Sequence, residues 1–157
     1  MHSRLFAKTM AALGLDSAYG AYLDRIPAPT LASVNLITLF GLNARLRGAL
    51  VGHLAMFEIT SAIPNRRYGN ALRRLDLASP AAVDFYDEHV EADSVHENIA
   101  AHDLGGGLAR TDPELADDIV FGARALLAVE GMFGDAVLGA WEAGRSSLLD
   151  SAYAPVA

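Results

Sequence analysis

The sequence predicts an all-α fold, and three observations support this prediction. Alanine is abundant, apolar residues recur at steps of three and four, and long stretches lack the apolar-polar alternation of strands. Prolines and glycines divide this helical pattern into separate segments. The expected helices cover residues 3–13, 17–25, 30–43, 44–63, 65–75, 81–102 and 113–143.

Start and stop signals mark the later helices most clearly. Ser79 with Pro80, and Asp112 with Pro113, each resemble an N-cap followed by the first helical residue. The three consecutive glycines at 105–107 interrupt the pattern, and we interpret them as a flexible hinge or connector.

Composition restricts the class of protein. The chain has 157 residues, is 52% hydrophobic and contains no cysteine, which excludes disulfide scaffolds, thiolate metal sites and cysteine nucleophiles. A net charge of -7 argues against a nucleic-acid partner. The most apolar stretch, 31–42, is too short to span a bilayer, and no signal peptide is evident. We therefore expect a soluble cytoplasmic protein with no membrane partner, made of one helical domain over 1–148 and a flexible tail over 149–157.

The segment 81–102 carries the most chemical information. His89, Asp93 and His96 fall within about 60° of one another on one helical face. The opposite face is acidic and is the natural solvent face. The three side chains therefore point inward, where a carboxylate is costly unless a cation or hydrogen-bond donors meet it.

This face has two interpretations that spacing alone weighs about equally. Two imidazoles and a carboxylate can converge on one metal ion or a close pair, and this ligand set suits iron, manganese or zinc. Alternatively, His89 and Asp93 form an i,i+4 hydrogen-bonded pair, His96 lies at a helix interface, and no metal binds. Asp93 and His96 also resemble half of a carboxylate-histidine metal motif completed by other helices, but no matching second motif occurs.

Two further acids lie in apolar helical segments. Glu58 shares a face with apolar residues and needs a partner, which can be a metal. On spacing alone, a hydrogen bond to a neighbouring helix or an ion pair with one of the arginines is about twice as well favoured. Those arginines are at positions 66, 67, 73 and 74. The same alternatives apply to Glu130, for which a role as metal ligand is less favoured than for Glu58. His53 is interpreted as a core or interface histidine.

Other catalytic motifs are poorly supported. The glycines at 105–107 follow a helical segment and lack the lysine and hydroxyl residue of a phosphate-binding loop. Ser146 and Ser147 have no histidine and aspartate pair nearby and no nucleophile-elbow pattern. Nucleotide binding and triad hydrolysis are therefore not predicted.

Four stretches of the sequence resemble the C-terminal part of bacterial iron-containing redox enzymes, which belong to the heme-oxygenase-like diiron oxidase and oxygenase superfamily. They are RLRGALVGHLAMFEITSAIPNRRYGNALRRL, FYDEHVEADSVHENIA, DIVFGARALL and AWEAGRSSLL. The resemblance is clearest over 45–149, and its most specific element is the arrangement of His89, Asp93 and His96. It implies a heme-oxygenase-like helical bundle that binds non-heme iron, in which two irons activate dioxygen to oxidise a small molecule.

The resemblance also implies a ligand set and a departure from it. Glu58, within the string HLAMFEITS, resembles the glutamate ligand on the preceding helix, and joins His89, Asp93 and His96 as a predicted metal ligand. The first core helix of these relatives supplies a Glu-x-x-His pair, but no glutamate precedes Glu58 here. We therefore expect a partial bundle whose chain starts after that helix, and an incomplete diiron centre.

These observations together predict a non-heme iron-binding redox protein that carries out dioxygen-dependent oxidation of a small organic molecule. The iron is expected as one ion or as a diiron pair, with manganese as an alternative metal. The alternative function is a non-catalytic helical interaction domain, or a truncated family member, that retains a partial metal site. Because the apolar faces that would pack on the missing helix remain, we expect a homo-oligomer or a helical partner that supplies the missing ligands.

Overall fold

The computed structural model describes residues 2–150, except for the side chain of Ser94, and its described part contains helices and no strands. The all-α prediction is therefore confirmed. The α-helices are α1 (His2–Ala12), α2 (Ala28–Gly41), α3 (Arg47–Arg74), α4 (Pro80–Asn98), α5 (Gly106–Thr111) and α6 (Ala116–Glu142). The 3-10 helices are η1 (Leu23–Arg25), η2 (Ala44–Leu46) and η4 (Pro113–Leu115), and η3 (Ile99–Gly105) is a π-helix.

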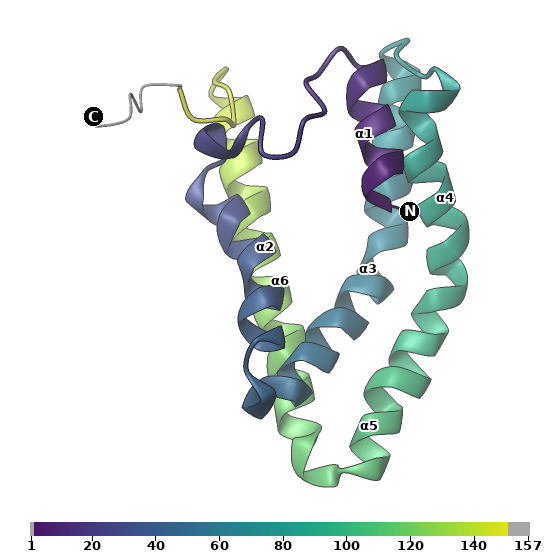
Figure 1. The fold of residues 1–157 in the computed structure, drawn as a ribbon, viewed down its shortest axis with the longest axis vertical. Helices are drawn as coiled ribbons and strands as arrows, with labels where there is room; N and C mark the ends of the chain where they lie inside the picture. The colour runs from purple at the N-terminus through teal and green to yellow at the C-terminus, as the bar shows by residue number, and fades with distance from the viewer. Residues whose placement is uncertain (1, 151–157) are drawn as a thin grey trace.

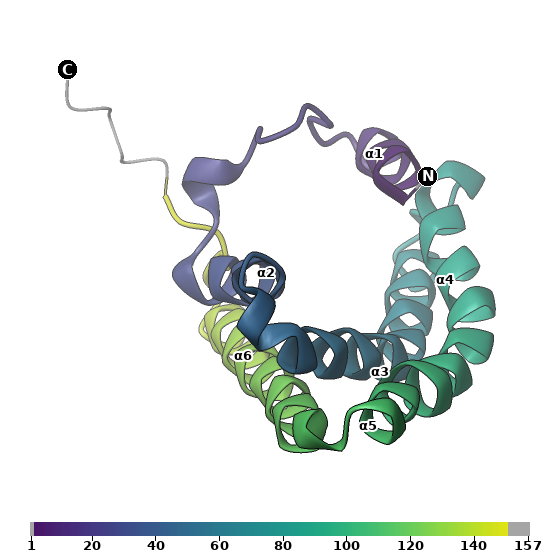
Figure 2. The ribbon, with the colours of Figure 1, turned by 60° about the horizontal axis from the view of Figure 1, so that its bottom comes forward.

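Helix α3 is the central element of the fold. It packs most extensively against α6 and α4, while α1 packs on α4 and α2 packs on α6 (Figure 1). Seen from the end, the helices follow one another around a ring instead of closing into a compact bundle (Figure 2). The upper part of α3 lies beside α4, so these two helices can present side chains to each other (Figure 1).

Helix α3 runs through Pro64, where the sequence pattern predicts a boundary between two helices. A proline removes one backbone donor and bends a helix, but it need not end one that is packed on both sides of the bend. The lower part of α3 leans onto α6 and its upper part lies beside α4 (Figure 1). Packing of both parts therefore outweighs the local signal, and the predicted division was wrong.

The predicted helix over 17–25 was also wrong, because only η1 forms there. Gly14 and Gly20 have positive φ angles of 74° and 80°, which a helix cannot contain. Asp16 Oδ1 accepts a hydrogen bond of 2.8 Å from the Ala18 N–H, and this side-chain turn competes with helical bonding. The segment is consequently a connection between α1 and α2.

The glycines at 105–107 are helical and do not form the predicted connector. The end of α4 continues as η3 and then as α5, and Gly105 is buried where an added methyl group would lie 3.7 Å from Ala55 Cβ. The chain turns instead at Asp112, before η4 begins with Pro113. Neither Ser79 nor Asp112 makes a side-chain capping bond, although each occupies the predicted N-cap position.

The crossing of α3 and α6 is unusually close. A methyl group added at Gly52 would lie 1.8 Å from the Ile119 carbonyl oxygen, and one at Gly122 would lie 1.9 Å from the Ala49 carbonyl oxygen. The two backbones touch directly, since Ala49 is fully buried and neither glycine has a side chain. Leu126, one turn further along α6, is 2% exposed and continues this contact as the main large side chain of the core.

The surface of the protein is large for its mass. Its solvent-accessible area is 10709 Å², whereas a compact monomer of 16.6 kDa exposes about 7,600 Å². An allowance of about 1,200 Å² for the residues outside the described part leaves most of this difference. Many large apolar side chains are exposed, including Val34, Leu39 and Phe57. Association with a second copy or a helical partner stays a prediction.

The described end of the chain contacts the loop before α2. The Leu149 N–H donates a hydrogen bond of 2.8 Å to the Arg25 carbonyl oxygen. The remainder of the predicted tail, 151–157, lies outside the described residues, and the single-domain division over 1–148 stays a prediction. Within 2–150, no helix combines the length and the apolar character needed to cross a membrane.

Candidate metal centre

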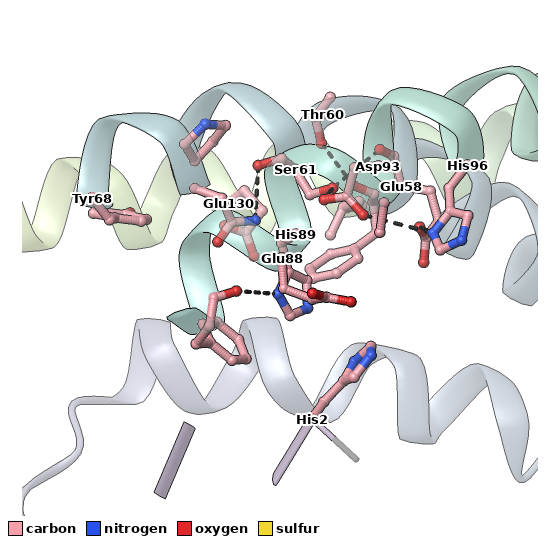
Figure 3. Close-up of a pocket in the computed structure, with 16 residues that line it drawn as sticks. His2, Glu58, Thr60, Ser61, Tyr68, Glu88, His89, Asp93, His96 and Glu130 are labelled. Carbon is pink, nitrogen blue, oxygen red and sulfur yellow. Dashed lines mark hydrogen bonds and ion pairs between the residues drawn. The ribbon is translucent and has the colours of Figure 1, made fainter. Parts of the chain in front are cut away.

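Helices α3 and α4 bring Glu58 together with Asp93 and His96 (Figure 3). One ligand atom from each lies within 4.8 Å of the others. His96 Nδ1 is 3.2 Å from Glu58 Oε2 and 3.7 Å from Asp93 Oδ1. Asp93 is buried, and the side chains of Glu58 and His96 are 29% and 50% exposed. Two carboxylates and an imidazole therefore converge from two helices, and their role as metal ligands stays a prediction. His96, which was expected to point inward, is half exposed because it lies at the edge of the contact between α3 and α4.

Ser61 orients the buried carboxylate. Its hydroxyl donates a hydrogen bond of 2.6 Å to Asp93 Oδ2, and the Glu58 carbonyl oxygen lies farther away at 3.1 Å. A hydroxyl has one proton, so the charged and nearer acceptor takes it. Asp93 Oδ1 is left to face His96. The sequence reasoning missed Ser61, although its position three residues after Glu58 places it on the same face of α3.

No lysine or arginine forms a salt bridge with Glu58 or Asp93 among residues 2–150. The ion pair considered for Glu58 is therefore not formed, and Arg73 instead pairs with Asp87 at 2.6 Å. Two adjacent carboxylates repel each other and favour a nearby positive charge. The donor set consequently fits a divalent cation, which would offset both negative charges and accept the imidazole nitrogen.

His89 lies outside this group of three. Its Nδ1 is 2.6 Å from the Phe85 carbonyl oxygen, and a carbonyl can only accept, so Nδ1 carries the proton. The Nε2 atom is thereby left with a free lone pair, which is the usual arrangement of a metal-binding histidine. The considered i,i+4 pair with Asp93 is replaced by these contacts to Phe85 and Ser61.

A cavity of about 360 Å³ adjoins the group and includes all four predicted ligands in its wall. Its other lining residues are His2, Phe57, Thr60, Ser61, Pro64, Asn65, Tyr68, Phe85, Glu88, Ala92, Leu126 and Glu130. This volume lies within the range of small-molecule sites. The predicted residues therefore share one site even though His89 stands apart from the other three.

His2 is the lining residue that the sequence gave least reason to expect. The ring centroids of His2 and His89 are 4.8 Å apart, because Phe6 packs against Phe85 and holds α1 on α4. Thr9, also in α1, is 1% exposed and donates a hydrogen bond of 3.3 Å to the Ala81 carbonyl oxygen. Helix α1 thus covers part of the face that we expected to be left bare.

Glu130 reaches the cavity from α6. It accepts a hydrogen bond from the Ser33 hydroxyl of α2, which is the neighbouring-helix bond considered for it. His53 lies in the core with 3% exposure, as predicted, and neither ring nitrogen has a hydrogen-bond partner among the described residues. Burial lowers the pKa of His53 below its ordinary value, and the negative charge of Glu130 opposes this shift.

The fold and the site define an all-α protein with a carboxylate and histidine group suited to a metal ion. The profile of a family described as iron-containing redox enzyme matches residues 1–131, and the chain belongs to this family. This match begins earlier and ends earlier than the resemblance over 45–149. No curated protein and no solved structure matches the chain.

Proposed function

We propose that this protein binds non-heme iron between α3 and α4 and uses it for dioxygen-dependent oxidation of a small organic molecule in the adjoining cavity. The observation that carries the proposal is the convergence of Glu58, Asp93 and His96 within 4.8 Å. Oxygen and imidazole ligands of this kind suit iron, with manganese as the alternative metal. Membership of an iron-containing redox enzyme family supports the choice of iron.

The residues of the group have separate tasks in this proposal. Glu58 and Asp93 supply the negative charge that offsets a divalent ion, and His96 supplies a neutral nitrogen ligand. Ser61 donates a hydrogen bond to Asp93 Oδ2 and so limits the directions from which the Asp93 carboxylate can bind a metal ion. Iron bound by these residues would activate dioxygen, and the apolar and aromatic side chains of the cavity offer packing surface to an organic substrate.

A diiron form of the proposal places the second ion toward His89. The Phe85 carbonyl fixes the ring so that Nε2 is the free nitrogen, and His2 offers a second imidazole beside it. Both histidines line the same cavity as the group of three. Two ions at these positions would both face a substrate in the cavity.

Replacing Asp93 with asparagine gives the most direct test of the metal group. Loss of one charge at its most buried member is expected to weaken ferrous iron binding at least about tenfold, with helicity unchanged. Anaerobic iron titration with metal analysis measures the affinity, and oxygen-dependent reoxidation of the bound ferrous iron tests the redox step.

Asp84→Asn provides the matched control, because Asp84 lies on the same helix at an exposed position. It should bind iron as the unaltered protein does. Equal iron affinity in Asp93→Asn and Asp84→Asn would reject the metal group. Absence of iron binding by the unaltered protein would favour the non-catalytic interaction domain, which the large exposed apolar surface supports.

A further inference from the structure

We propose that the cavity selects substrates that carry a protonated amine, and that Glu130 is the residue that binds the amine. This inference rests on the proposed function, since it names the substrate class of the same cavity. It follows from the charge of the lining, the surroundings of Glu130, and the apolar groups that line the same cavity.

The lining of the cavity is acidic. It contains carboxylates and histidines, and no lysine or arginine of the described chain contributes to it. The carboxylates are Glu58, Glu88, Asp93 and Glu130. A metal ion at Glu58 and Asp93 would offset those two charges. Glu88 also lines the groove between α1 and α4, whose other charged residues are Arg4, Lys8, Asp84, Asp87 and Glu91.

Glu130 is the acid of the lining that a hydroxyl group of α2 holds in position. Its Oε1 accepts the Ser33 hydroxyl proton, and it forms no salt bridge among residues 2–150. The histidine beside it, His53, is held neutral near neutral pH by its burial. Ser33 fixes the position of the carboxylate but leaves its charge in place, so a cationic group of a ligand fits here.

The remaining lining determines the body of the ligand. Phe57, Tyr68, Phe85 and Leu126 give the wall its apolar and aromatic character. Aromatic faces attract ammonium groups and accept hydrocarbon equally well. A carboxylic acid, by contrast, would lie among like charges and could be neutralised only by bound metal. The cavity therefore favours a small amine with an apolar body.

Three probes of matched shape test this selection: 2-phenylethylamine, 2-phenylethanol and 3-phenylpropionate. Their binding is measured by titration calorimetry, in the anaerobic ferrous protein and again in the metal-free protein. The amine is expected to bind at least about tenfold tighter than the propionate, with the alcohol between them, because an ion pair with Glu130 adds a charge-assisted hydrogen bond. The metal-free arm keeps this result independent of iron binding.

Variants assign the selection to Glu130. Glu130→Gln should abolish the preference for the amine while leaving iron stoichiometry unchanged, and Glu130→Asp should retain it. Ser33→Ala should weaken it in part, because the carboxylate loses its fixed position. Glu142→Gln, which removes an exposed acid at the end of the same helix, should behave as the unaltered protein does.

The proposal is overturned by propionate binding as tightly as the amine in metal-free protein, or by the absence of amine binding at millimolar concentration. It is also overturned if folded Glu130→Gln keeps the preference, or if Glu142→Gln loses it. Should Glu130→Gln fail to fold by circular dichroism, the comparison of Glu130→Asp with Ser33→Ala decides: an unchanged preference in Ser33→Ala counts against the assignment.

Discussion

Helix α3 has two parts that make different kinds of contact, residues 47–57 and residues 58–74. The first part meets α6 through Gly52 and Ala49, which let the two backbones touch. The second part meets α4 and the cavity through Glu58 and Ser61, whose polar atoms engage Asp93 and His96. Close backbone contact fixes where the helix lies, and this position determines which polar groups can meet farther along it. The positions of the proposed metal ligands therefore depend on a crossing that contains none of them.

Substitution of Gly52 by alanine should have the largest effect on stability. The added methyl group would lie 1.8 Å from the Ile119 carbonyl oxygen, so the helices must separate. We expect a loss of about 3 kcal/mol or more in the free energy of unfolding. Urea unfolding followed by circular dichroism measures it, and the displaced α3 should also bind iron less tightly.

Gly131→Ala is the control for this substitution. Gly131 lies in α6, and nothing stands within 4 Å of the position that its Cβ would take. Alanine should therefore stabilise the helix by up to about 1 kcal/mol through its higher helix propensity. If Gly52→Ala and Gly131→Ala shifted stability in the same direction, the close crossing would be incorrect.

His53 is a buried polar residue in the first part of α3, and it makes the free energy of unfolding depend on pH. Its folded-state pKa lies below the ordinary 6.5 because burial disfavours the charged ring, with Glu130 acting in opposition. Below about pH 6.5 the unfolded chain therefore binds more protons at this residue than the folded chain does. Its contribution to the free energy of unfolding should fall as the pH drops from 7.5 to 5.5, and should stay constant above 7.5.

His53→Leu removes this contribution. The variant should lose less stability between pH 7.5 and 5.5 than the unaltered protein, by up to about 1.4 kcal/mol for each pH unit. Urea unfolding at the two pH values measures the difference. Parallel losses in both proteins would show that His53 titrates alike in the folded and unfolded chains, contrary to the structure.

The smallest effect on stability is expected at the C-terminal end of α3. Arg73 pairs with Asp87 of α4 at 2.6 Å, but the two side chains are 45% and 48% exposed. Water and salt screen such a pair, so Arg73→Ala should cost less than about 1 kcal/mol. A double-mutant cycle with Asp87→Ala isolates the pair energy, and Arg74→Ala controls for the loss of charge. A coupling above about 2 kcal/mol would mean that this ion pair, and not the glycine crossing, positions α4.

Helical periodicity made much of the site predictable. Residues three and four apart share a face whatever the rest of the fold does, so the common face of His89, Asp93 and His96 could be read locally. Periodicity does not report hydrogen bonds, and the Phe85 carbonyl turns His89 to a separate part of the cavity. His2 could not be placed, because it approaches His89 only through packing between distant segments.

The errors in the predicted helix boundaries have a related origin. Pro64 and the glycines at 105–107 are strong local signals for a break, and both lie within continuous helical structure. Tertiary contacts on each side offset their local cost, and the sequence contains no direct measure of those contacts. Gly14 and Gly20 had the opposite effect, since their positive φ angles ended a segment whose apolar pattern predicted a helix.

The proline within α3 has a consequence for the backbone of the cavity wall. Proline has no N–H, so the Thr60 carbonyl receives no hydrogen bond from the residue four positions later. Thr60 and Pro64 both line the cavity, which places this gap in the helical ladder on its wall. This turn of α3 therefore lacks the regular hydrogen bond between residues 60 and 64, and no substitution of the Thr60 side chain restores it.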